Sequence, residues 1–371
     1  MVKLEKDLFV ITSDEDVPTV ELASTDLVKG EDYELVGDIS ACGAGTYSVY
    51  VVGKGNYSGK VKLTWTVTEE HYEDRTFKHS VSLKNNLAIN FYVSADGITE
   101  ANDITLEALN QRTGNTETLT GTLETVGGAK MYKFSYTGIA AVNAGDIIVA
   151  TPVIKLSDGT EYRFNSDGYS IAEYCYSVIE KSTTNAKLKT LAVDLLNFCS
   201  AVQTYAKSTE PLVNADLTPE QQALGTQGDL NLTSVEDQET LEGATASFAA
   251  KTVVVGNNIS LKYFVDLSNV ENIENVTITL KYAGKEKTFT YADFGKGRST
   301  GEYTLTYSEL PVNAFSEPIE AVVYENGEAI SGKFTYSIES YAAAILEKST
   351  NESMKKVVDT MMRYAASANA Y

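Results

Sequence analysis

The chain contains two diverged copies of one sequence unit, at residues 76–205 and 248–371. Matching motifs recur in the same order at a spacing of 167–172 residues, as expected when loops are trimmed within a shared fold. Any chemistry must therefore sit in one copy or in both. The matched motifs are Asn85-Asn86-Leu87 with Asn257-Asn258-Ile259, Tyr132-x-Phe134-x-Tyr136 with Tyr303-x-Leu305-x-Tyr307, Val142-Asn143-Ala144 with Val312-Asn313-Ala314, and Tyr169-Ser170-Ile171 with Tyr336-Ser337-Ile338.

Each copy is predicted to change from strands to helices along its length. Alternating apolar positions such as Ile89, Phe91 and Val93 indicate strands with one buried face. We expect each copy to be a β-sandwich ending in an antiparallel helical hairpin that covers Tyr92 or its match Phe264. The helical positions, spaced by three and four residues, are Ile171, Tyr174, Cys175, Val178, Leu188, Leu191, Leu195, Phe198, Val202 and Tyr205 in the first copy, and Ile338, Tyr341, Ala342, Ile345, Met354, Val357, Met361, Tyr364, Ala368 and Tyr371 in the second.

The N-terminal part of the chain has no second copy. A chain of 371 residues can form two or three domains, each with its own core. Residues 60–67 alternate polar and apolar side chains as a half-buried strand does, and Trp65 occupies one of the alternating positions. Thr218-Pro219-Glu220-Gln221 carries the N-cap, first-turn proline and capping box of a short helix. We predict a mainly β chain with domains at 1–70, 71–209 and 238–371, and a structured connector at 210–237.

Two parts of the chain resemble known families. Residues 27–35, with Gly30-Glu31-Asp32-Tyr33 at their centre, and residues 44–67 resemble the bacterial immunoglobulin-like repeats of secreted Gram-positive surface proteins. The motifs Tyr-Ser-Ile…Glu-Lys-Ser-Thr and Asp-Leu-Leu-Asn-Phe resemble modules of large secreted proteins from gut and rumen clostridia, especially ruminococci. These resemblances imply an immunoglobulin-like sandwich followed by two tandem β-sandwich modules. The immunoglobulin-like family has a buried Phe at the position of Trp65, so we expect Trp65 in the core. They also imply an extracellular or cell-surface parent in fibre- or starch-degrading bacteria.

An excess of acidic residues limits the possible partners. The formal net charge is −21, and phosphate contact requires clustered Lys and Arg, so nucleic acid and anionic membranes are unfavourable partners. No stretch approaches the ~18 apolar residues of a membrane helix. Residues 8–11 are too short an apolar run for a secretory signal, so Met1 is expected to be a cytosolic start or the edge of a trimmed piece. We expect a monomer without membrane insertion, and the resemblances favour the extracellular alternative.

Three cysteines, an odd number, argue against a disulfide scaffold. Cys175 and Cys199 match Ala342 and Ala365 in the second copy, so small residues at both positions suggest closely approaching helices. Two interpretations stay open for this pair: packed thiols that act as small apolar residues, or one bridge across the hairpin. Cys42 is expected to lie in a loop without a role.

Few residues point to catalysis. The two histidines, His71 and His79, both follow the first domain, and neither has a counterpart in the second copy. A catalytic triad or dyad would therefore have to be built across a domain junction. The sequence has no zinc or calcium ligand motif, and small sandwiches offer no deep cleft for a pair of glycosidase carboxylates. We expect no catalytic residue, no metal and no cofactor.

Aromatic side chains are the main candidates for ligand contact. Sugars can stack their apolar faces on such rings while polar side chains at the rim bond their hydroxyls. Two stretches carry rings where the other copy has none. The candidate ligand-binding residues are Tyr291, Asp293, Phe294 and Arg298 in one stretch, and Tyr162 and Asn165 in the other. The alternative is structural: Tyr291 ends a core-facing strand, Phe294 closes the sandwich edge, and residues 162–165 form a strand with alternating faces.

We predict a non-catalytic extracellular module that binds a polysaccharide, with starch or another plant glucan favoured by the resemblance. Weak individual sites would be strengthened when several modules share one polymer. The alternative is a structural stalk or a protein-binding adhesive repeat that contacts other surface proteins of its parent assembly. A third hypothesis is an intramolecular Lys–Asn isopeptide bond, as Gram-positive adhesins use.

Overall fold

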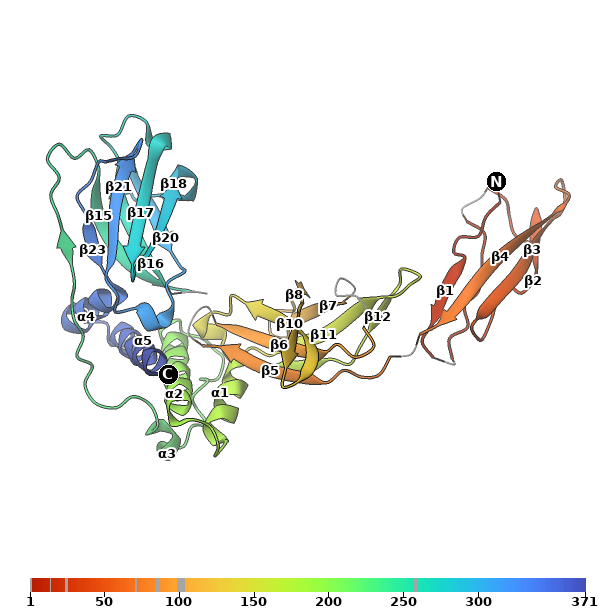
Figure 1. Cartoon of the computed structure of the whole chain (residues 1–371), viewed down its shortest axis with the longest axis horizontal. Coiled ribbons are helices and arrows are strands. Elements are labelled where there is room, and N and C mark those ends of the chain that lie inside the picture. The colour runs from red at the N-terminus through yellow and green to blue at the C-terminus, as the bar shows by residue number, and fades with distance from the viewer. Residues whose placement is uncertain are drawn as a thin grey trace.

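The computed structural model describes residues 2–13, 15–23, 26–70, 72–83, 87–98, 104–256 and 259–371. The chain is mainly β, as predicted, with antiparallel sheets and two helical hairpins (Figure 1). The asparagines of the first repeat motif (85, 86, 257 and 258) and His71 lie outside the described residues.

The N-terminal sheet has the strand order β1-β4-β3-β2, and β1 is the strand that pairs in parallel. Trp65 is 1% exposed and forms the centre of a small, separate core, as predicted. Its indole N–H donates to the Asp38 carbonyl at 2.9 Å, which satisfies the one polar atom that burial would otherwise leave unpaired. The strands are β1 (Leu8–Ile11), β2 (Tyr33–Gly37), β3 (Gly45–Gly53) and β4 (Lys60–Glu69).

The first unit, defined here as residues 77–205, has two sheets and a helical hairpin. One sheet has the order β5-β6-β10-β9; the other has β12-β11-β7-β8, with β13 also paired to β11. The elements are β5 (Phe77–Ser82), β6 (Ala88–Ser94), β7 (Ile104–Asn110), β8 (Thr116–Thr120), β9 (Thr122–Val126), β10 (Ala129–Thr137), η2 (Ala141–Asn143), β11 (Ile148–Lys155), β12 (Glu161–Arg163), β13 (Asp167–Tyr169), α1 (Ile171–Glu180) and α2 (Ala186–Tyr205).

The second unit, residues 237–370, repeats this arrangement. Its sheet β15-β16-β20-β19 matches β5-β6-β10-β9, and the path β23-β21-β17-β18 matches β13-β11-β7-β8. The elements are β14 (Asp237–Gln238), β15 (Ser247–Val255), β16 (Ile259–Asp266), η3 (Ile273–Asn275), β17 (Val276–Tyr282), β18 (Lys285–Thr290), η4 (Tyr291–Asp293), β19 (Gly295–Lys296), β20 (Glu302–Tyr307), η5 (Val312–Ala314), β21 (Ile319–Glu325), β22 (Glu328–Ala329), β23 (Phe334–Tyr336), α4 (Ile338–Lys348) and α5 (Glu352–Ala370).

Local capping explains where the helices begin. Ser170 precedes α1 and its side chain accepts the Glu173 N–H at 3.1 Å. In the connector, Thr218 and Gln221 form the reciprocal capping box expected for α3 (Pro219–Gln222). Both contacts satisfy backbone N–H groups that a helix start leaves unpaired.

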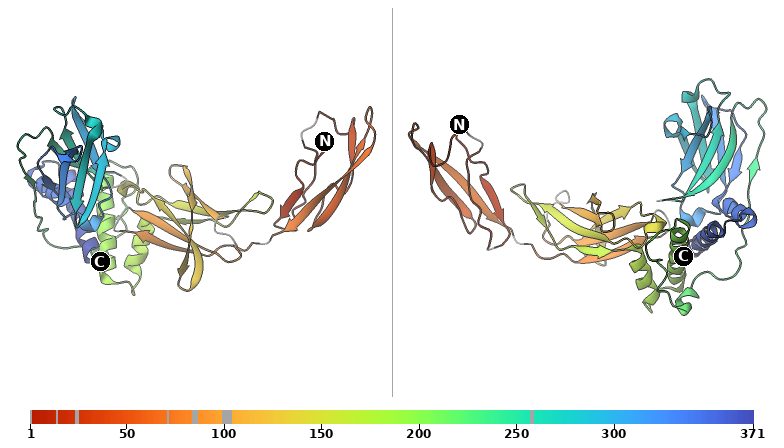
Figure 2. Two further views of the ribbon diagram at one scale, coloured as in Figure 1. Left: turned by 45° about the horizontal axis from the view of Figure 1, so that its top comes forward. Right: turned by 180° about the vertical axis from the view of Figure 1, so that it is seen from behind.

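The two hairpins meet each other between the two sandwiches (Figures 1 and 2). α2 packs along α5, and one continuous cluster of buried apolar side chains runs through both units. The prediction that the hairpins cover Tyr92 and Phe264 is wrong. The helices pack at the end of each sandwich, so the Phe264 ring is instead covered by the Arg298 guanidinium at 4.5 Å, and the Lys133 amine lies 6.0 Å from the Tyr92 ring.

The described cysteines are free thiols. Cys175 and Cys199 are completely buried on α1 and α2, where they act as small apolar residues. Burial raises the pKa of Cys175 to about 12 and raises that of Cys199 well above its usual value. Cys42 is exposed.

Candidate functional site

The interface between the two hairpins positions the most promising pocket. Phe198 of α2 and Tyr364 of α5 stack with ring centroids 5.9 Å apart and planes at 15°. The Tyr364 hydroxyl donates to the Leu83 carbonyl, next to β5 of the first unit. Side chains of the second unit therefore reach into the first, and the two units share one buried boundary.

The connector ties the same two helices together. Asp194 of α2 is 2% exposed and accepts two hydrogen bonds from Thr226, at 2.9 Å from its N–H and 2.6 Å from its hydroxyl. Arg363 of α5 donates to the Thr226 carbonyl at 2.9 Å. Thr226 thus bridges the two helices.

A pocket of about 540 Å³ opens where the end of α2 faces β15 and α4. Small-molecule sites commonly have volumes of about 300–1,000 Å³ and mainly apolar walls. The walls are aliphatic apart from Asn143, Tyr205, Thr252 and Tyr341, and none of the described residues that line the pocket is charged. Its lining comes from the first unit (Ala140, Val142, Asn143, Val202, Tyr205, Ala206) and the second (residues 252–256, Tyr341, Met354, Val357).

Two tyrosines from different units face this pocket. Tyr205, the last residue of α2, is 43% exposed, and Tyr341 of α4 is half-buried. Burial raises the pKa of Tyr341, a hydrogen bond with Thr252 opposes the rise, and the nearby Tyr205 hydroxyl adds to it. Tyr341 therefore stays neutral at physiological pH. The pocket offers uncharged hydroxyl and amide groups around an apolar centre, which suits a neutral ring-shaped ligand.

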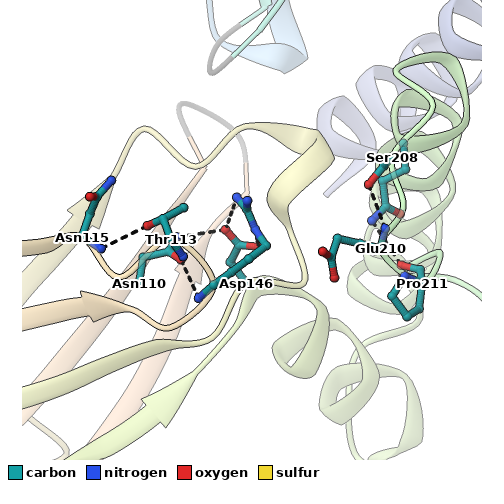
Figure 3. A network of polar contacts seen from close by, with 9 residues as sticks. Asn110, Thr113, Asn115, Asp146, Ser208, Glu210 and Pro211 are labelled. Carbon is teal, nitrogen blue, oxygen red and sulfur yellow. Dashed lines mark hydrogen bonds and ion pairs between the residues drawn. The ribbon is translucent and has the colours of Figure 1, made fainter.

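A second hollow, of about 450 Å³, is more polar and is used internally (Figure 3). Arg112 donates to both carboxylate oxygens of Asp146, at 2.7 and 2.8 Å, and Asn110 donates to Asp146 at 2.9 Å. Across the hollow, Gln203 donates to the Pro211 carbonyl at 3.2 Å and accepts the Val213 N–H at 3.0 Å. These bonds hold the start of the connector beside the first unit.

The predicted loop of the second unit lies at the edge of its sandwich. Tyr291 is 37% exposed, and its ring meets Phe294 at 85° and Tyr303 at 66°, so these rings do not form one flat surface. Phe294 is half-buried against the core. Asp293 accepts the Thr290 N–H at 2.8 Å and so caps its own turn.

Arg298, in the same loop, is paired within the loop. Its Nε and Nη2 donate to Glu302 at 2.9 and 2.6 Å. These bonds and the Arg298 backbone N–H lower the pKa of Glu302 to about 2. The structure thus brings Tyr291, Phe294 and Arg298 into one loop, but the polar groups predicted to form a rim already have partners.

The other predicted pair, Tyr162 and Asn165, lies near the junction with the N-terminal sheet. The Tyr162 ring packs 5.3 Å from the Tyr72 ring and 5.0 Å from the Phe164 ring. Asn165 accepts the Arg75 N–H at 2.6 Å and donates to the Arg75 carbonyl at 3.2 Å. Both side chains therefore hold the segment that follows the N-terminal sheet, far in sequence from the loop at 291–298.

His79, the histidine in the described part of the chain, lies between an aromatic ring and a carboxylate. His79 stacks on Tyr169 with centroids 4.2 Å apart, and its Nε2 lies 3.2 Å from Asp167. Burial lowers the pKa of His79 in spite of that carboxylate. Over the described ranges, no group of three or more His, Cys, Asp or Glu side chains is placed to hold a metal ion. Among the helices in the described part of the chain, none combines the length and apolar content needed to cross a bilayer.

Sequence reasoning missed Tyr205 and Tyr341 as site residues. Their helical spacing assigned both to the apolar faces of the hairpins, and neither copy alone contains the pocket. One signal was available: the matched Val142-Asn143-Ala144 motif supplies two of its lining residues, Val142 and Asn143.

Comparisons with known proteins place the chain in no family, since no family model matches and no curated protein matches. Solved structures give distant likenesses. A pullulanase from Anoxybacillus sp. LM18-11, complexed with maltotriose, is 11% identical with a TM-score of 0.14, covering 68% of this chain and 24% of its own. The Bacteroides ovatus glucan utilization protein SGBP-B, in complex with a mixed-linkage heptasaccharide, is 14% identical with a TM-score of 0.16, covering 90% and 66%. The first eight immunoglobulin domains of Down syndrome cell adhesion molecule are 9% identical with a TM-score of 0.17, covering 91% and 54%. The chain thus spans a quarter to two thirds of these proteins, and likenesses this weak carry no argument about its ligand.

Proposed function

We propose that this chain is a non-catalytic module that binds a neutral polysaccharide, with the inter-unit pocket as its binding site. The observation that carries the proposal is that Tyr205 and Tyr341, from different units, both line a pocket of about 540 Å³ whose described lining residues are all uncharged. A plant glucan such as starch has the matching chemistry, since each sugar ring has apolar faces and uncharged hydroxyls.

The chemistry of the pocket supports a neutral ligand over a charged one. An anion would meet the field of a chain with net charge −21, and the described lining residues offer no cation to compensate. A cation would find no carboxylate among those residues. A neutral sugar ring avoids both costs, because the aliphatic walls and tyrosine rings cover its faces while Asn143 and Thr252 can bond its hydroxyls.

The setting of this activity is part of the same proposal. An extracellular or bacterial cell-surface location rests on the resemblance to immunoglobulin-like and ruminococcal modules. The proposed absence of catalysis rests on the packing of His79 against Tyr169 and on the internal pairing of the carboxylates near the predicted loops.

A second candidate is a rigid spacer between other domains of a surface protein. One observation favours it: the N-terminal sheet is fastened to the first unit by the Lys6–Asp158 ion pair and by the Ser157 hydroxyl, which donates to Glu70 at 2.6 Å. Such a fastening restricts the angle between neighbouring domains, as a spacer requires.

Retention on insoluble starch and cellulose tests the binding proposal. We expect wild type to be retained and Tyr205→Ala and Tyr341→Ala to lose about tenfold or more in affinity, since each removes one ring from the site. Tyr57→Ala is the matched control, because Tyr57 is 50% exposed beside the N-terminal sheet. Phe294→Ala and Tyr162→Ala report on the two loops predicted from sequence. If Phe294→Ala or Tyr162→Ala loses binding while Tyr205→Ala binds normally, the binding site lies in the corresponding loop and not in the inter-unit pocket. If neither wild type nor any variant is retained on the polysaccharides, the spacer role is favoured.

A further inference from the structure

The contact between the two hairpins joins equivalent residues. Phe198 and Tyr364 occupy matching positions in the second helix of each copy, and their rings stack on each other. In an assembly of two like units, a residue that contacts its own equivalent lies next to a two-fold axis. This stack of matched residues is the contact that an approximate two-fold axis between the two units would produce.

The two units also repeat their internal packing. In the first unit, η2 packs on α2 and α1 contacts β5; in the second, η5 packs on α5 and α4 contacts β15. With units related in this way, a site that one unit forms against the other has a counterpart with the roles of the two units exchanged. The inter-unit pocket is such a site, because the end of α2 in the first unit faces β15 and α4 in the second.

The equivalent residues are present on the other side of the axis. Tyr371 matches Tyr205, and Tyr174 matches Tyr341. Their exposures also match: Tyr371 is 48% exposed against 43% for Tyr205, and Tyr174 is half-buried like Tyr341. Further matches are Asn313 for Asn143, Val312 for Val142, Ala368 for Val202 and Leu191 for Val357.

The two tyrosines on this side are close in space. Burial raises the pKa of Tyr174, and the neighbouring Cys175 thiol and Tyr371 hydroxyl raise it further. The Tyr371 hydroxyl raises the pKa of Tyr174, just as the Tyr205 hydroxyl raises the pKa of Tyr341. Tyr174 belongs to the first unit and Tyr371 follows the last helix of the second, so this pair also joins the two units.

We propose that the face of α1 beside Tyr174 and Tyr371 forms a second binding site for a neutral sugar ring, equivalent to the pocket of Tyr205 and Tyr341. This inference rests on the proposed function, since it assigns the same ligand class to the second site. One wall differs in polarity between the two sites: Ser80 and Ser82 stand where the first has Thr252 and Val254. Their hydroxyls accept from Asn90 at 3.2 and 3.3 Å, so the second site has the more polar wall. The counterpart of Gly256, at position 84, lies outside the described residues.

Two sites on one chain would have a functional consequence. A polymer that occupies one site raises the effective concentration of its other segments at the second site. Binding to a long glucan would then exceed binding to a short oligosaccharide without any additional contact.

Isothermal titration calorimetry with maltoheptaose tests this inference on the full chain. We expect a stoichiometry of two for wild type, one for Tyr205→Ala, one for Tyr371→Ala, and no binding for the double variant. Tyr174→Ala is a second way to remove the new site, and circular dichroism checks that each variant is folded. A wild-type stoichiometry of one that Tyr371→Ala leaves unchanged would overturn the second site and leave the proposed function standing. No binding of maltoheptaose or of a mixed-linkage glucan by wild type would overturn both.

Discussion

Removing one hydroxyl group should weaken the boundary between the two units. Tyr364 is 3% exposed, and its hydroxyl donates to the carbonyl of Leu83, which is itself 6% exposed. Tyr364→Phe keeps the ring stacked on Phe198 and leaves that carbonyl without its donor. A buried polar group that loses its partner costs about 1–3 kcal/mol. Because the buried cluster is continuous across both units, we expect the loss to appear in their joint unfolding.

The single tryptophan allows the unfolding of the N-terminal sheet to be measured separately from that of the two units. Trp65 lies in the separate core of the N-terminal sheet, so its fluorescence reports on that sheet, whereas far-UV circular dichroism is dominated by the helices of the two units. In urea, the circular dichroism transition of Tyr364→Phe should move to lower denaturant and the fluorescence transition should not. Tyr205→Phe, which removes an exposed hydroxyl, should change stability by less than about 0.5 kcal/mol. A Tyr364→Phe variant as stable as wild type would refute the shared boundary.

Two further predictions concern thiols and acid. Under native conditions, a thiol reagent should label Cys42 rapidly and Cys175 and Cys199 slowly, because burial keeps the latter two thiols protonated. In denaturant all three thiols should react. If only one thiol reacts in denaturant, Cys175 and Cys199 are joined in a disulfide. The pKa of Glu302 is lowered to about 2, below its unfolded value of about 4.3, so its contribution is fully present above pH 4.3 and is lost as pH falls toward 2. The melting temperature of Arg298→Gln should therefore be lower than that of wild type at pH 7, and the difference should shrink in acid; a difference independent of pH would contradict the pairing.

Much of the fold was predictable because its signals are local. Ser170 and Thr218 satisfy backbone N–H groups within three residues, so the helix starts follow from short motifs. The strand pattern around Phe91 and the burial of Trp65 follow from alternation along a single strand. Duplicated motifs then predicted duplicated sheets.

The pairing of the hairpins was not predictable from local signals. Phe198 and Tyr364 each lie on an apolar helix face, and that pattern is equally satisfied by a helix packed on its own sandwich. The pocket could not be predicted for the same reason, because Tyr205 and Tyr341 come together only when the two units pack against each other. In the predicted loop, Asp293 and Arg298 are suitable sugar ligands by type, and the structure pairs them internally with Thr290 and Glu302, three and four residues away.

The most direct test of the inter-unit site follows individual tyrosine rings during ligand addition. Ring-labelled tyrosine spectra, assigned by single Tyr→Phe variants, can be recorded by nuclear magnetic resonance as maltoheptaose is added. The account predicts saturable shifts at Tyr205 and Tyr341, with Tyr57 and Tyr291 unchanged. Shifts confined to Tyr291, or none at any tyrosine in the presence of saturating glucan, would contradict it.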